Sequence, residues 1–195
     1  MNKNKEIASI FEKMADMLEF LGDNPYRIST YRRVANILSE LGVDIEELVK
    51  TGKIHQVPGI GESSIEKIVE YLRTGSISKY EELKRKVPED LLELMDVPSI
   101  GPKTLKLAYD RLGVRTKDDF LRALRSGMLA IIPGFGEKKL QNIARGIELW
   151  EKSKERMTLI EAFEIAKGYL SYIKKMESLL ESVEPAGSVR RKKET

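Results

Sequence analysis

The chain has 195 residues; 41% are hydrophobic, 33% are charged, and the formal net charge is +3 at pH 7. This length fits one domain or two small ones. The absence of cysteine and the presence of a single histidine exclude disulfides, zinc fingers, thiol catalysis and multi-histidine metal sites. The sequence contains neither an apolar run of transmembrane length nor a secretory signal, so we expect an intracellular protein with no membrane partner.

The N-terminal third is helical by its apolar pattern. A first helix ends at Gly22 and carries apolar residues three and four positions apart: Ile7, Ile10, Phe11, Met14, Leu18 and Leu21. Asn24 and Pro25 then supply a cap and a first-turn proline. The second helix buries Tyr31, Val34, Leu38 and Leu41, and a shorter helix over 44–50 ends at Gly52. No convincing strand pattern precedes the C-terminal end, so the fold class is all-α.

A proline turn in an apolar frame occurs three times in the chain. The copies are "VPGIG" at 57–61, "VPSIG" at 97–101 and "IPGFG" at 132–136. The first and third also share the preceding helix end, a glycine and the helix that follows. Self-similarity of this kind indicates repeated units. Helix, tight glycine turn and helix together form a helix-hairpin-helix motif.

Each turn predicts a phosphate-sized site made of main chain. The glycines tolerate positive φ, and the first N–H groups of the following helix have no intrahelical partner. An anion is favoured at that helix end. The candidate backbone-binding residues are Gly59, Gly61, Ser99, Gly101, Gly134 and Gly136, with charge added by Lys103 and Lys138. The alternative is that each turn only connects two helices.

The helix after the first turn poses a question about Lys67. Its apolar face contains Ile65, Ile68, Val69 and Leu72, and Lys67 lies nearly opposite that face. By pattern alone Lys67 is a surface lysine. A reactive lysine needs burial or nearby positive charge to lower its pKa. The segment "YRISTYRR" at 26–33 offers such charge, but the pattern leaves open whether it faces Lys67.

Taken together, the segments resemble the N-terminal half of the bacterial and archaeal family X DNA polymerases, relatives of DNA polymerase beta. The segments that carry the resemblance are "NPYRISTYRRVANIL", "VPGIGESSIEKIVEYLRTG", "VPSIGPKTLKLAYDRLG", "IPGFGEKKLQNI" and "AGSVRRKKET". It implies a lyase-like helical domain over 1–78 with the first hairpin. It also implies a fingers domain over 79–156 with the other two, and the start of an α/β palm over 157–195. A long helix is expected from Thr158, with Glu161 completing a capping box.

The resemblance implies deoxyribose-phosphate lyase chemistry at the first hairpin. Lys67 matches the Schiff-base lysine, Tyr31 the tyrosine that positions it, and Arg27 a basic residue that holds the 5′-phosphate. His55 and Ser63 stand where the family has two further phosphate-binding lysines. Both belong to the expected DNA-binding set, but they depart from the family pattern.

The remaining implied sites lie further along the chain. The main-chain oxygens of Met95, Val97 and Ile100 match those that hold a monovalent cation, Na⁺ or K⁺, at the second hairpin. Gly187, Ser188 and Arg191 match residues that bind the phosphates of a nucleotide. The family's Gly-Asp-x-Asp carboxylates for two Mg²⁺ ions would come next, but the sequence ends at Thr195. Mg²⁺ is therefore expected only in a full-length enzyme.

Two main functional hypotheses follow. In the first, the chain is the DNA-binding portion of a repair polymerase, which binds gapped DNA with a 5′-phosphate and has 5′-deoxyribose-phosphate lyase activity. In the second, it is a DNA-binding module without chemistry, and Lys67 is only a charge. A third possibility is a protein interaction scaffold. We expect a monomer in the cytoplasm, associated with the nucleoid.

Overall fold

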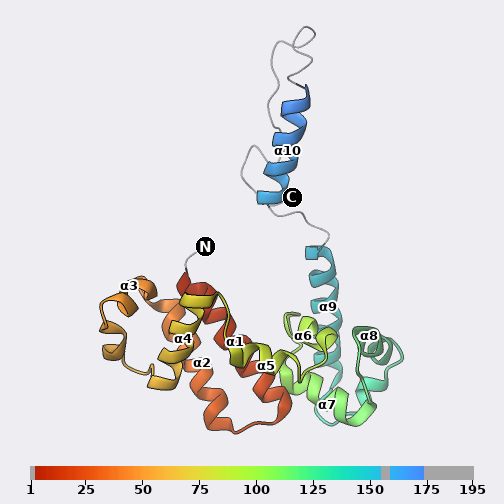
Figure 1. Cartoon of the computed structure of the whole chain (residues 1–195). Helices are drawn as coiled ribbons and strands as arrows, with labels where there is room; N and C mark the ends of the chain where they lie inside the picture. Colours follow the sequence, from red (N-terminus) through yellow and green to blue (C-terminus); the bar gives the residue numbers. More distant parts are fainter. Residues whose placement is uncertain (1–2, 155–158, 174–195) are drawn as a thin grey trace. The chain divides into compact units, whose positions relative to one another are not determined.

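The computed structural model describes residues 3–154 and 159–173. Over these residues the chain is built from helices and contains no strand, which confirms the all-α prediction (Figure 1). The expected palm residues 174–195, the cap at Thr158 and the nucleotide-binding residues Gly187, Ser188 and Arg191 lie outside the described residues. The chain divides into two compact units, Met1–Gly146 and Ile147–Thr195.

The first unit begins with two long helices. Helix α1 (Lys3–Leu21) packs along α2 (Pro25–Glu40), and its contacts extend to α3 (Ile45–Lys50). The predicted cap is present, since the Asn24 side chain accepts the N–H of Tyr26 and Pro25 opens α2. Most of the predicted apolar positions are buried, but Leu21 is exposed because it lies in the last turn of α1.

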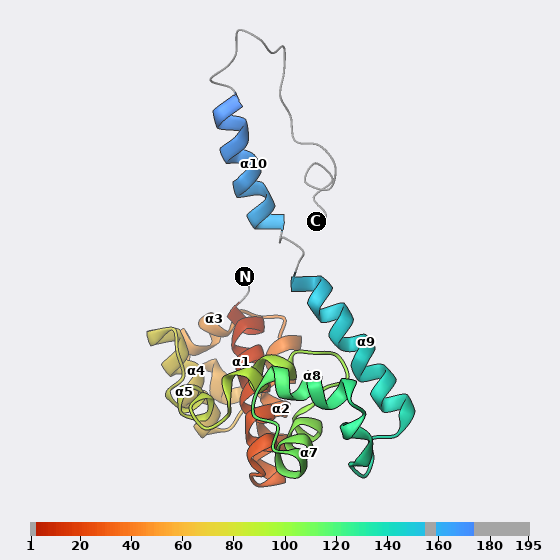
Figure 2. The ribbon, with the colours of Figure 1, turned by 90° about the vertical axis from the view of Figure 1, so that its right-hand side faces the viewer.

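The first hairpin follows. The 3₁₀ helix η1 (Lys53–Gln56) leads through the turn into α4 (Glu62–Thr74), and α5 (Ser78–Lys84) comes next. Helix α5 also contacts α1, so the chain returns to the first two helices. Of the predicted apolar face of α4, Ile65 and Ile68 are buried, whereas Val69 is exposed. The view turned by 90° shows the same group of helices around α1 (Figure 2).

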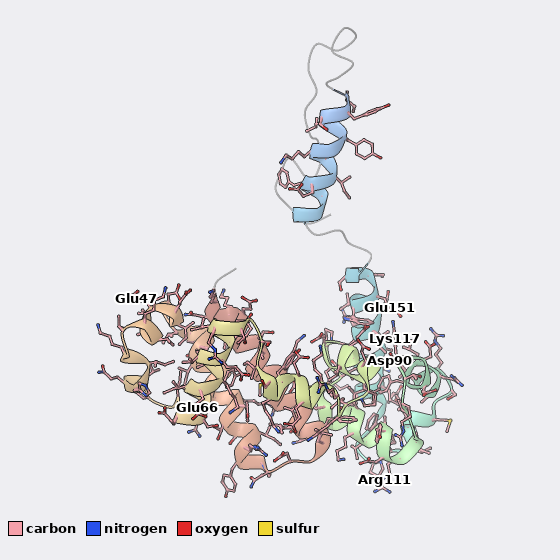
Figure 3. The ribbon with its side chains drawn as sticks, in the orientation of Figure 1. Glu47, Glu66, Asp90, Arg111, Lys117 and Glu151 are labelled. Carbon is pink, nitrogen blue, oxygen red and sulfur yellow. The ribbon has the colours of Figure 1, made fainter. Side chains whose placement is uncertain are left out.

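The other two hairpins occupy the rest of the first unit. The second joins α6 (Glu89–Met95) to α7 (Pro102–Leu112), and α7 packs against α1. After α8 (Lys117–Arg125), η2 (Met128–Ile131) leads through the third turn into α9 (Glu137–Lys154). Asp90 accepts the backbone N–H of Lys117 at 3.1 Å, which ties the start of α6 to the start of α8 (Figure 3).

The second unit contains helix α10 (Leu159–Ile173). Its apolar side chains include exposed aromatic rings, with Phe163 39% exposed and Tyr169 67% exposed. No helix in the described ranges is both long enough and apolar enough to cross a membrane.

Candidate active site and nucleic-acid interface

All three hairpins have the same backbone conformation. The third turn residue is left-handed in each copy, with φ of +87° at Gly59, +71° at Ser99 and +86° at Gly134. Ser99 takes this conformation although it is not glycine. The second glycine differs from our expectation, because Gly61 and Gly101 have extended φ values of −85° and −95°.

The uncovered main chain predicted for these turns is present at the first hairpin. Within the described residues, the backbone N–H groups of Gly61, Glu62 and Ser63 donate to no backbone or side-chain acceptor. A side chain at Gly61 would meet nothing within 4 Å, so the turn is open to a ligand. Free donors at a helix N-terminus favour an anion, which fits a phosphate contact.

The lysines beside the other hairpins have different surroundings. Lys103 forms an ion pair with Glu19 at 3.4 Å, although 81% of its side chain is exposed. Lys138 is exposed. The Lys139 ammonium lies 3.9 Å from the centroid of the Phe135 ring, and burial lowers the pKa of this lysine. Of these three lysines, Lys138 alone has neither an ion pair nor an aromatic contact within the described residues.

The predicted catalytic residues of the first hairpin meet in one pocket of about 480 Å³. Residues of α2, α4 and α5 line it: Arg27, Thr30, Tyr31, Gly61, Glu62, Ser63, Ser64, Lys67 and Lys79. The pocket therefore places Lys67, Tyr31 and Arg27 together, as the resemblance implied. It also borders the free N–H groups at the start of α4.

Lys67 is half-buried in this pocket. Its ammonium nitrogen lies 6.0 Å from the centroid of the Tyr31 ring and donates to the main-chain oxygen of Ser63 at 2.8 Å and to its hydroxyl at 2.9 Å. Burial lowers the pKa of Lys67, and the charges of Arg27 and Lys79 lower it further, against the raising effect of Glu66 and Glu70. A lowered pKa enlarges the neutral, nucleophilic fraction of an amine.

Tyr31 lines the pocket beside this amine. Its side chain is only 9% exposed, and its ring packs against Phe11 with centroids 5.7 Å apart. Burial raises the pKa of Tyr31, so the phenol stays protonated. Tyr71, by contrast, turns toward α1, where a hydrogen bond to Glu6 raises its pKa to about 12.

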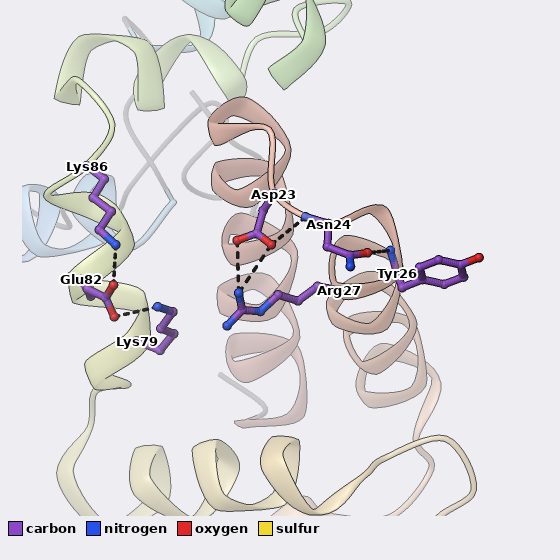
Figure 4. Close-up of polar contacts among 7 residues, drawn as sticks. All are labelled: Asp23, Asn24, Tyr26, Arg27, Lys79, Glu82 and Lys86. Carbon is purple, nitrogen blue, oxygen red and sulfur yellow. Dashed lines mark hydrogen bonds and ion pairs between the residues drawn. The ribbon is translucent and has the colours of Figure 1, made fainter.

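Two of the cations that line the pocket, Arg27 and Lys79, come from different helices. Figure 4 shows both side chains with their carboxylate partners. The Arg27 guanidinium pairs at 3.2 Å with Asp23, which directly precedes the N-cap of α2. Lys79, at the start of α5, pairs with Glu82 at 2.7 Å, and Glu82 also holds Lys86 at 2.6 Å. These two lysines lower the pKa of Glu82 to about 2. The sequence analysis did not identify Lys79 as a neighbour of Lys67, since no spacing links the two residues.

Not every predicted neighbour reaches the pocket. His55 lies outside the lining and faces Glu62, with 3.3 Å between Nδ1 and the carboxylate. Arg32 turns toward α1, where it pairs with Asp16 at 2.9 Å and Glu19 at 2.6 Å. Burial raises the pKa of Asp16. Arg32 and Arg33 instead line a separate groove together with Lys103 and Lys106.

At the second hairpin, the three main-chain oxygens that the resemblance implies for a monovalent cation differ in their hydrogen bonding. The Val97 carbonyl accepts the N–H of Ile100 at 3.0 Å, which closes the turn. Within the described residues, the carbonyls of Met95 and Ile100 accept no hydrogen bond. Unpaired main-chain oxygens are suitable ligands for a hard cation. In the part of the chain that the structure describes, no cluster of three or more His, Cys, Asp or Glu forms a metal site.

Comparison with known proteins agrees with this architecture. Residues 2–77 match a helix-hairpin-helix domain family, and residues 91–148 match a SAM-like helix-hairpin-helix tandem family. The chain is 29% identical over 191 residues to the DNA polymerase/3′-5′ exonuclease PolX of Bacillus subtilis (strain 168), and this alignment covers 98% of the chain. It is 27% identical over 117 residues to DNA polymerase lambda of Arabidopsis thaliana, covering 60% of the chain.

These similarities define a helix-hairpin-helix protein. More specifically, the chain is related to the family X DNA polymerases and corresponds to their N-terminal helix-hairpin-helix region. It spans about a third of the length of the Bacillus protein and about a fifth of the plant protein. The two family matches leave residues 78–90 between them, and the domain limits at 78/79 and 156/157 stay a prediction.

Proposed function

We propose that this chain binds gapped DNA through its sugar-phosphate backbone and 5′-phosphate, and that Lys67 is the nucleophile of a 5′-deoxyribose-phosphate lyase. The observation that carries the proposal is the amine of Lys67 in a pocket shared with Tyr31, Arg27 and Lys79. Arg27 and Lys79 supply the positive charge that a 5′-phosphate requires. Free N–H groups at the start of α4 add neutral donors on the same side.

In the proposed lyase reaction, Lys67 forms the covalent bond to the sugar. The neutral amine attacks C1′ of the ring-opened sugar, a C–N bond forms, and the aldehyde oxygen leaves as water to give an imine. Loss of the C2′ proton then lets the C3′–O bond break, and the 3′-phosphate departs with the electron pair. Hydrolysis of the imine returns the amine. Tyr31 limits the space beside the amine and keeps its ring face toward it.

The three hairpins supply binding that does not depend on base sequence. Main-chain donors contact phosphates and fix the position of a duplex or strand without reading bases. At the second hairpin, the main-chain oxygens of Met95, Val97 and Ile100 would hold a monovalent cation, which would add positive charge beside a phosphate. We expect affinity for DNA to fall steeply with salt, because phosphate contacts release counterions.

Borohydride trapping on gapped DNA with a 5′-deoxyribose phosphate tests the lyase. We expect a covalent adduct with the wild-type chain and none with Lys67→Ala, while Lys53→Ala, an exposed lysine before the same turn, keeps the adduct. The trapping rate should rise with pH to a plateau. The midpoint of the rise should lie below 10.5, the ordinary pKa of lysine, because burial lowers the pKa of Lys67. An adduct of unchanged yield in Lys67→Ala contradicts the assignment.

A binding module without chemistry is the second candidate. It is favoured by the position of His55, which pairs with Glu62 outside the pocket, and by the serine at position 63. This candidate predicts the same salt-dependent binding to gapped DNA but no trapped adduct. The trapping experiment therefore separates the two functions, provided that binding to the same DNA is measured alongside.

A further inference from the structure

The amine of Lys67 has a specific partner that the lyase proposal does not use. Both of its hydrogen bonds go to one residue, Ser63, at 2.8 Å to the main-chain oxygen and 2.9 Å to the hydroxyl. Ser63 lies in the first turn of α4 and lines the pocket. The two oxygens therefore hold the nitrogen from one side.

Two acceptors are enough for all the N–H groups of the neutral amine. A neutral primary amine has two N–H donors and one lone pair, whereas an ammonium has three donors. If Ser63 accepts both N–H groups, the lone pair points away from Ser63. An ammonium in the same place would direct its third N–H toward the pocket, whose lining includes the cations Arg27 and Lys79 and the carboxylate of Glu62. Arg27 and Lys79 disfavour the ammonium, whereas Glu66 and Glu70 favour it.

The three hairpins of the chain place different residues at these two positions. Two positions after the second turn glycine stand Ser63, Lys103 and Lys138 in the three copies, and six positions after it stand Lys67, Leu107 and Asn142. The second and third copies thus have a lysine two positions after the glycine and none six positions after it. Where Lys67 is present, a hydrogen-bond acceptor replaces that competing cation.

We propose that Ser63 is a positioning residue for Lys67: its carbonyl and hydroxyl oxygens take both N–H groups of the neutral amine and orient the lone pair toward the bound sugar aldehyde. This inference rests on the proposed lyase function. It assigns a role to a residue that departs from the family's lysine pattern. The hydroxyl is the part of this arrangement that substitution can remove, because the main-chain oxygen remains in any variant.

Reductive alkylation without DNA tests the positioning. The chain is treated with glycolaldehyde and cyanoborohydride over a range of pH, and peptide mapping gives the alkylation rate of each lysine. In the wild type, Lys67 should react faster than the exposed Lys53 at neutral pH. In Ser63→Ala, the plateau rate of Lys67 should fall about fivefold, the effect of one lost hydrogen bond. Ser63→Thr keeps a hydroxyl and should restore the rate.

The results separate this inference from the lyase proposal. Equal rates for Lys67 and Lys53 in the wild type would overturn the nucleophilic role of Lys67 and, with it, the inference. A fast Lys67 whose plateau rate is unchanged or increased in Ser63→Ala would overturn the inference alone. Failure of Ser63→Thr to restore the rate would also overturn it. The unfolding temperature and the alkylation rate at Lys53 serve as controls for a general loosening of α4. Such loosening would change more than the Lys67 plateau rate, and Ser63→Thr would not reverse it.

Discussion

The first and third hairpins are close copies with different surroundings. Their turns have almost the same left-handed conformation, with φ of +87° at Gly59 and +86° at Gly134. A side chain added at Gly59 would come within 2.7 Å of Cδ1 of Ile37 on α2, whereas one at Gly134 would meet nothing within 4 Å. At the first hairpin, residues of α2 and α5 line the pocket in which Lys67 lies.

This comparison separates what the motif does from what its neighbours add. The turn has the same left-handed residue in every copy, because its conformation is local, and at the first hairpin it leaves backbone donors free. A pocket with a nucleophile requires a second helix carrying Tyr31 and a third carrying Lys79. The second hairpin also has surroundings of its own, because its turn packs against α9. A Cβ atom added at Gly146 of α9 would lie 2.1 Å from the carbonyl oxygen of Pro98.

Substituting alanine at the two matched glycines has the largest expected effect on stability. We expect Gly59→Ala to lower the free energy of unfolding by about 2 kcal/mol, from the left-handed conformation and the contact with Ile37. Gly134→Ala should cost only about 1 kcal/mol, since it has the conformational cost alone. Urea denaturation of both variants measures the difference, and equal losses would contradict the packing of the first turn on α2.

The second hairpin should respond in the opposite direction. Ser99 is the one non-glycine residue with positive φ among the described residues, at +71°. Ser99→Gly should therefore raise the free energy of unfolding by about 1 kcal/mol, because it removes the strain of the left-handed conformation. Thermal unfolding of this variant checks the value. A lower stability than the wild type would mean that the serine side chain contributes more than the strain costs.

The smallest expected effect is a change in DNA affinity, and it concerns Lys79, which the sequence analysis did not identify. Glu82 pairs with Lys79, and because its pKa is about 2 it stays charged at any physiological pH. Glu82→Gln frees Lys79 for a phosphate, so affinity for a 5′-phosphorylated gap should rise about twofold, within the range of exposed ion pairs. The gain should vanish on the same DNA without the 5′-phosphate. Fluorescence anisotropy on the two substrates makes the comparison.

Much of the fold and part of the site were predictable from the sequence. The helices follow from apolar spacing, the cap at Asn24 from residue type, and the three turns from proline and glycine in a repeated frame. The family relation then pointed to Lys67, Tyr31 and Arg27, and the structure brings these three to one pocket. Leu21 and Val69 lie on the predicted apolar faces of their helices but are 37% and 38% exposed, because spacing places a side chain on a face without deciding whether another element covers it.

The sequence by itself determined the helical class, the three hairpin turns and the free backbone donors of the first, because these depend on contacts between residues a few positions apart. Tertiary structure decided which charges surround Lys67. It brought Lys79 into the pocket from α5, drew Arg32 away to the carboxylates of α1, and left His55 beside Glu62. The direction of a side chain on its own helix follows from periodicity, but the helix that it faces is set only when the whole core packs.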